Sequence, residues 1–119
     1  MIYPQEIEVW YVLPAIRREL AKSLVDQGLS QKEVALKLGI TEAAISQYLK
    51  NKRASEIEFE PFIKKAIERA AKRITKQGNI MKEIERINYL MKKNKNLCEI
   101  HHKYDKALPK YCDICLYEK

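Results

Sequence analysis

The chain has 119 residues, of which 33% are charged and 8% aromatic, and its formal net charge is +7. This length suits one small domain with a tail, and the few glycines and prolines favour helices over strands. No apolar run approaches the ~18 residues of a membrane span, and no signal peptide is visible at the start. We therefore expect a cytoplasmic, all-α protein with no membrane partner.

Two helices are predicted before residue 30. Residues 1–13 favour a short helix that ends before Pro14, and a second helix runs from Pro14 to Gly28, because proline is tolerated in a first helical turn. The second helix carries an apolar stripe with a spacing of four, formed by Ile16, Leu20 and Leu24. This helix is expected to support the segment that follows.

Residues 31–50 contain two short helical patterns that meet at Gly39. Their apolar positions are Val34, Ala35 and Leu38 in the first, and Ile45, Tyr48 and Leu49 in the second. Ser30 and Glu33 fit a capping box, Thr41 is placed to cap the second helix, and Gly39 suits a backbone of positive φ. This is the layout of a DNA-binding helix-turn-helix, whose second helix enters the major groove. The alternative is a helical hairpin with a glycine in its turn and no role in DNA binding.

The charge distribution agrees with DNA binding. Residues 1–29 carry a net charge of −1, whereas residues 30–55 carry +3. A positive surface suits contacts to phosphates, although a generally basic protein would show the same excess. In the DNA-binding interpretation, the helix from Glu42 to Lys50 lies in the major groove of double-stranded DNA.

The residue types of this second helix indicate separate roles. The residues expected to face the bases are Thr41, Glu42, Ala43, Ser46 and Gln47. Gln47 is suited to an adenine, Glu42 to a cytosine and Ala43 to a thymine methyl group. The residues expected at the phosphates are Gln31, Lys50, Lys52 and Arg53, with Asn51 opening the turn Asn51-Lys52-Arg53. A solvated loop is the alternative for this turn.

Two further helices are predicted, with a break at Gly78-Asn79. Pro61 starts the first, whose stripe is Ile63, Ile67, Ala70 and Ile74. The second repeats the spacing with Ile80, Ile84, Ile87 and Met91, a short heptad-like seam. The seam could pack on the chain's own core or on a second copy. We favour a homodimer, because regulators of this kind bind two-fold, pseudo-palindromic operators as dimers.

All three cysteines lie in the last 22 residues of the chain. The spacing is Cys98-x2-His101, then ten residues, then Cys112-x2-Cys115, and His102 is a second choice for the histidine ligand. Pairs separated by two residues reach one metal from a tight turn, so four ligands are available. A Cys3His set suits tetrahedral Zn²⁺, and it equally suits an iron–sulfur cluster in which histidine replaces one cysteine.

Nearly the whole chain resembles a group of small archaeal regulators of the Cro/repressor-like (XRE) superfamily. The resemblance rests on Leu13 to Arg17, on Tyr48 to Arg53, and on the tail pairs Cys98-x2-His101 and Cys112-x2-Cys115. It implies an iron–sulfur cluster, with [2Fe–2S] as the favoured type, in a redox-sensing or iron–sulfur-sensing role.

The predicted fold is a five- to six-helix, repressor-like helix-turn-helix domain with an added dimerisation helix and a small C-terminal cluster-binding loop. The corresponding boundaries are 1–77, 78–96 and 97–119, with the core motif at 31–50. The predicted function is a sequence-specific, homodimeric transcriptional regulator with an iron–sulfur sensor. The alternative is a zinc-stapled DNA-binding or protein-interaction adaptor. We expect no enzyme and no small-molecule substrate, because the sequence shows no catalytic group pair or phosphate loop.

Overall fold

A computed structural model describes residues 3–50, 58–76, 78–93 and 100 of the chain. The elements in this part are all helical: α1 (Pro4–Ile7), the π-helical turn η1 (Glu8–Val12), α2 (Leu13–Asp26), α3 (Gln31–Leu38), α4 (Glu42–Leu49), α5 (Pro61–Lys76) and α6 (Ile80–Lys93). The predicted all-α class is confirmed, while the predicted C-terminal loop lies outside the described residues. Among the described helices, none has the length and apolarity needed to cross a membrane.

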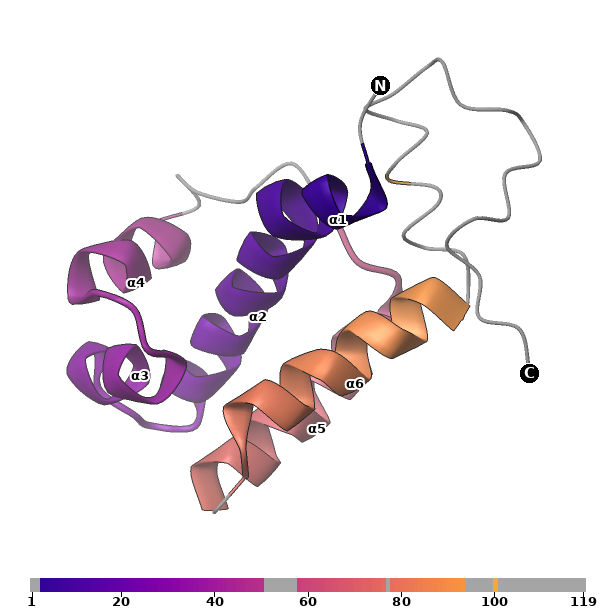
Figure 1. The fold of residues 1–119 in the computed structure, drawn as a ribbon. Coiled ribbons are helices and arrows are strands. Elements are labelled where there is room, and N and C mark those ends of the chain that lie inside the picture. Colours follow the sequence, from indigo (N-terminus) through magenta and orange to yellow (C-terminus); the bar gives the residue numbers. More distant parts are fainter. Residues whose placement is uncertain (1–2, 51–57, 77, 94–99, 101–119) are drawn as a thin grey trace.

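Helix α2 lies in the middle of the molecule. Figure 1 shows α3 and α4 on one side of it and the α5–α6 hairpin on the other. The stripe predicted from the sequence, Ile16, Leu20 and Leu24, is fully buried. Ala15 and Ala21 are also fully buried, because a helix covered on two sides needs more than one apolar stripe. Helix α2 is therefore the common support of both halves of the fold.

The N-terminal segment joins α2 without the break expected before Pro14. Helix α2 begins at Leu13 with Pro14 in its first turn, and η1 precedes it directly. The N–H of Leu13 donates to the carbonyl of Glu8, five residues earlier. A proline has no N–H and its ring clashes with the carbonyl four residues before it. The wider π turn accommodates Pro14, so the two predicted helices follow one another continuously.

The predicted break at Gly78-Asn79 is confirmed as a tight connection between α5 and α6. The N–H of Gly78 donates to the carbonyl of Arg73 at 2.6 Å, and a Cβ at residue 78 would lie only 2.7 Å from that carbonyl. Asn79 Oδ1 then accepts from the N–H of Met81 at 2.9 Å and of Lys82 at 3.2 Å. Glycine followed by a capping asparagine therefore reverses the chain here.

The apolar seam of α6 packs largely within its own chain. Ile87 and Met91 are buried, and Ile80 and Ile84 are half-buried against the same core. An ion pair of 2.7 Å between Lys92 Nζ and Glu8 Oε1 also joins α6 to η1. Of the two alternatives for the seam, packing on the chain's own core therefore holds for Ile87 and Met91.

Candidate nucleic-acid interface

Helix α3 begins at a capping box. Ser30 Oγ accepts a hydrogen bond from the N–H of Glu33 at 3.1 Å, and Glu33 Oε1 accepts from the N–H of Ser30 at 3.2 Å. Hydrogen bonds from Ser30 to the ionised carboxylate, the one from its backbone N–H above all, lower the pKa of Glu33 below its ordinary value. The predicted start of the motif is confirmed, and two otherwise unpaired N–H groups are satisfied.

The turn between α3 and α4 depends on a left-handed residue. Gly39 has φ 69° and ψ 32°, and its N–H donates to the carbonyl of Ala35. Because residues with a Cβ are strained in this region, the glycine predicted here is the residue that suits the turn. Ala35 is buried, in agreement with the small side chain expected where the two helices cross.

Helix α4 is capped at its start and anchored along one face. Thr41 is extended, and its Oγ1 accepts a hydrogen bond from the N–H of Ala44 at 3.1 Å. Ile45 and Tyr48 are buried as predicted, and Leu49 is half-buried. Ala44 is buried as well, which the sequence analysis had not assigned to the apolar face. The helix thus turns a defined opposite face to solvent.

The residues predicted to contact bases lie on this solvent face. Thr41, Glu42, Ala43 and Gln47 are exposed, and Ser46 is half-buried. A face of short polar and small side chains on a capped helix is suited to approach base edges. The structure thus leaves four of these side chains exposed and Ser46 partly accessible, on α4 and at its N-cap.

The predicted phosphate-contacting residues flank the helix. Gln31, at the start of α3, and Lys50, directly after α4, are both exposed. Helix α4 itself carries one charged residue, Glu42, in the first turn, where the helix dipole favours an anion. Positive charge in the described part of this motif therefore lies outside α4, on Lys50 and on the exposed Lys32 and Lys37 of α3.

Several predicted site residues lie outside the described part of the chain. These are Asn51, Lys52 and Arg53 of the basic turn, and Cys98, His101, Cys112 and Cys115 of the tail. Within residues 3–50, 58–76, 78–93 and 100, no three His, Cys, Asp or Glu side chains gather as a metal site would require. The four tail ligands stay a prediction from their spacing.

A second concentration of positive charge, not predicted from the sequence, lies on α5. Helix α5 contains six basic residues and one acidic residue, an excess of +5 that is larger than that of residues 30–55. Arg69 and Arg73 of this helix line a groove together with Arg86 of α6. The sequence did contain a signal for this basic surface, because Arg69 and Arg73 are one helical turn apart and therefore lie on the same side of α5. Their approach to Arg86 depends on the α5–α6 hairpin and could not be read from spacing.

Comparison with known proteins identifies the central segment. Residues 18–59 match a family model described as Helix-turn-helix, which covers most of α2 together with α3 and α4. Neither the curated proteins nor the solved structures gave a match. The family match and the capped, exposed helix α4 together support a DNA-binding transcriptional regulator.

Proposed function

We propose that this chain, whose residues 18–59 match a helix-turn-helix family model, is a sequence-specific transcriptional regulator that reads double-stranded DNA with α4. The observation that carries the proposal is the exposed polar face of α4, held in place by the buried Ile45 and Tyr48 on its other side. A rigid support behind a recognition helix is what base reading in the major groove requires.

Within this proposal, Gln47 pairs with an adenine, Glu42 accepts from a cytosine and Ala43 contacts a thymine methyl group. Thr41 and Ser46 lie beside them and complete the base-facing set. Phosphate contacts come from Gln31 and Lys50, and from the turn Asn51-Lys52-Arg53. The phosphate contacts set affinity and register, whereas the base contacts set sequence preference.

Selection from a pool of random duplexes tests the proposal, followed by titrations of the enriched sequence at several salt concentrations. We expect one enriched sequence with two-fold character. Replacing Lys50 with alanine should weaken binding to every sequence and reduce the salt slope by about one. The matched control is Lys82→Ala, since Lys82 is exposed on α6, across α2 from α4. A pool without enrichment, or equal effects of the two variants, would contradict the proposal.

The homodimer is a further part of the proposal, because a two-fold operator with half-sites about 34 Å apart needs two copies of the helix-turn-helix. Ile87 and Met91 are used within the chain, but Met81 at the start of α6 is 75% exposed and Ile84 is half-buried. We place the contact between copies at this end of α6.

Light scattering on the full chain, with Met81→Glu and Trp10→Glu, tests the dimer and its face. Trp10 is the matched control, since it is 55% exposed on η1. We expect a dimer mass that Met81→Glu reduces and Trp10→Glu leaves unchanged. A monomer that binds the two-fold operator without cooperativity would contradict the homodimer. Dissociation by Trp10→Glu alone would place the contact between copies at η1 instead of α6.

The regulatory input proposed is an iron–sulfur cluster, most simply [2Fe–2S], held by Cys98, His101, Cys112 and Cys115. Three thiolates and one imidazole are donors that such clusters accept, and the cluster supplies a one-electron redox centre when bound. The same donors fit Zn²⁺, which would make the site structural and the protein a zinc-stapled DNA-binding or interaction module.

Metal analysis with a visible spectrum on anaerobically purified protein separates iron from zinc. Operator affinity is then compared among oxidised, reduced and metal-free protein at one salt concentration. A sensor requires affinities that differ between these forms. Equal affinities would contradict the proposed sensor role of the tail and leave the DNA-binding proposal intact.

A further inference from the structure

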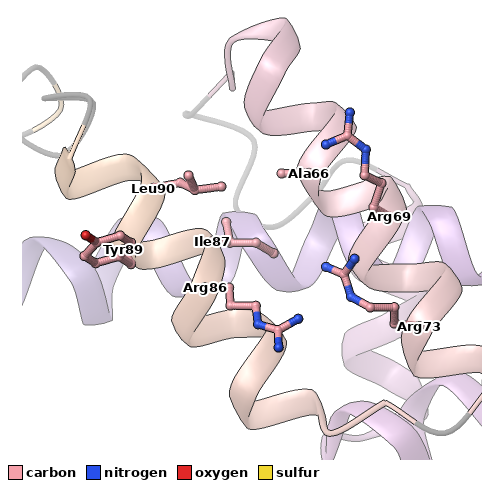
Figure 2. A pocket seen from close by; sticks show the side chains of 7 residues that line it. All are labelled: Ala66, Arg69, Arg73, Arg86, Ile87, Tyr89 and Leu90. Atoms are coloured by element: carbon pink, nitrogen blue, oxygen red, sulfur yellow. The ribbon is translucent and has the colours of Figure 1, made fainter.

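A groove of about 290 Å³ lies between α5 and α6, on the outer side of the hairpin. Its apolar surface comes from Ala66, Ile87 and Leu90, and its polar groups are the hydroxyl of Tyr89 and three arginines, Arg69, Arg73 and Arg86. Figure 2 shows the guanidinium groups of Arg73 and Arg86 extending toward one another from the two helices, with Arg69 farther along α5. The groove thus combines an apolar wall with cationic groups from both helices.

The positive charge in this groove exceeds the negative charge available to balance it. Arg73 is hydrogen-bonded to Glu83 at 2.8–3.0 Å, and Arg86 Nη1 lies 3.5 Å from the same carboxylate. Within the part of the chain that the structure describes, Arg69 has no carboxylate partner. Two of the three guanidinium groups therefore share the one carboxylate of Glu83, and an anion placed among the three would gain charge-assisted hydrogen bonds.

The residue types define the ligand class. Guanidinium groups present planar forks of donors that match carboxylate and phosphate oxygens in pairs. An apolar wall beside them suits the hydrocarbon part of the same molecule, and a volume of about 290 Å³ is at the lower end for small-molecule sites. We propose that this groove binds a small organic anion, with its carboxylate or phosphate group at the arginines and its apolar part against Ile87 and Leu90.

The proposed ligand is separate from the DNA of the proposed function. Figure 1 shows α2 between α4 and the α5–α6 hairpin, so a duplex seated on α4 has α2 between itself and the groove. We propose only binding of this ligand, without a chemical step. Its expected effect is to join α5 and α6 more firmly.

A nuclear magnetic resonance titration of the ¹⁵N-labelled full chain at 0.15 M salt tests the site. The probes are phenyl phosphate and benzoate, which differ in the anionic group. Two further probes are phenol, which lacks the anionic group, and inorganic phosphate, which lacks the apolar part. We expect saturable amide shifts confined to the two helices around the groove for one or both organic anions. Phenol and inorganic phosphate should bind at least about tenfold more weakly, since each makes only part of the contacts.

Two variants connect the shifts to the groove. Arg69→Gln removes the guanidinium that has no carboxylate partner among the described residues, so the melting temperature should be unchanged while the affinity falls about tenfold. Lys64→Gln is the control, since Lys64 is an exposed cation of α5 that does not line the groove. Arg86→Gln should also weaken binding, because it removes a donor from the opposite helix.

Three results would overturn the proposal. The first is an absence of saturable shifts for both organic anions. The second is an equal loss of affinity for the organic anions in Arg69→Gln and Lys64→Gln, which would indicate a general attraction of anions to α5. The third is displacement of the probe by an operator duplex or by a polyglutamate peptide bound in the groove, which would make the groove a macromolecular contact. None of these results bears on base reading by α4.

Discussion

Arg73, in the last turn of α5, donates hydrogen bonds of 2.8–3.0 Å to both carboxylate oxygens of Glu83 in the first turn of α6. The Glu83 side chain is only 5% exposed, whereas that of Arg73 is 46% exposed. The paired guanidinium lowers the pKa of Glu83, and the carboxylate raises the pKa of Arg73. This link fixes the hairpin that brings Ile87 into the core and the arginines into the groove.

Replacing Glu83 with glutamine should therefore destabilise the protein at pH 7. In the folded chain the pKa of Glu83 is below its ordinary 4.5. Its contribution to the free energy of unfolding is therefore fully present above pH 4.5 and is lost as the pH falls through the lower, folded pKa. We expect a loss of about 1–2 kcal/mol in the free energy of unfolding at pH 7, since a hydrogen-bonded charge is removed.

Urea unfolding at pH 7 and pH 3 measures this difference, with the exposed Glu85→Gln as the control on the same helix. The difference in the free energy of unfolding between wild type and Glu83→Gln should narrow at pH 3, because protonation of the unfolded carboxylate below pH 4.5 reduces the contribution of the ionised pair. A gap of the same size at both pH values would contradict an ionised Glu83 as its source.

Alanine at the two turn glycines should have unequal effects. At Gly39 a Cβ meets nothing within 4 Å, so the cost is the left-handed backbone alone, about 1 kcal/mol. At Gly78 a Cβ would lie 2.7 Å from the backbone of Arg73, so the turn must open and the loss should reach at least about 2 kcal/mol. Thermal unfolding of the two variants compares them, and a larger loss at Gly39 would contradict the close contact at Gly78.

Thr41 has a capping role that can be separated from its proposed DNA contact. Thr41→Ala should cost about 1 kcal/mol of stability, because the N–H of Ala44 loses its acceptor. Thr41→Asp keeps an acceptor at the cap and should retain the stability, but it adds a negative charge beside the phosphates. We expect operator affinity to fall in Thr41→Asp despite normal unfolding. Wild-type affinity in that variant would place Thr41 away from the duplex.

Local signals in the sequence were sufficient to predict the helix-turn-helix. The Ser30–Glu33 capping box, the left-handed Gly39 and the Thr41 cap each depend on residues within four positions, and all three are confirmed. The exposure of Gln47 followed from the same periodicity, because Ile45 and Tyr48 fix which face is buried. The roles assigned to individual residues at bases and phosphates stay predictions.

Features that depend on contacts between distant segments were not accessible in the same way. The π turn before Pro14 results from the backbone's adjustment to a proline within a continuous helix, which residue spacing does not encode. The burial of Met91 required knowledge of where α6 packs. The arginine groove required the hairpin geometry set by Gly78 and Glu83, although the charge excess of α5 was visible in the sequence.

Base reading by Gln47 from the exposed face of α4 is the part of the proposed function that one titration tests most directly. The direct measurement is a set of affinities for the selected operator and for operators with one substituted base pair, determined for wild type and Gln47→Ala at one salt concentration. We expect substitution at one position in each half-site to cost wild type about 1–3 kcal/mol of binding free energy, and Gln47→Ala to lose this preference at that position alone. A variant that weakens binding equally at all positions, or retains every base preference of the wild type, would contradict it.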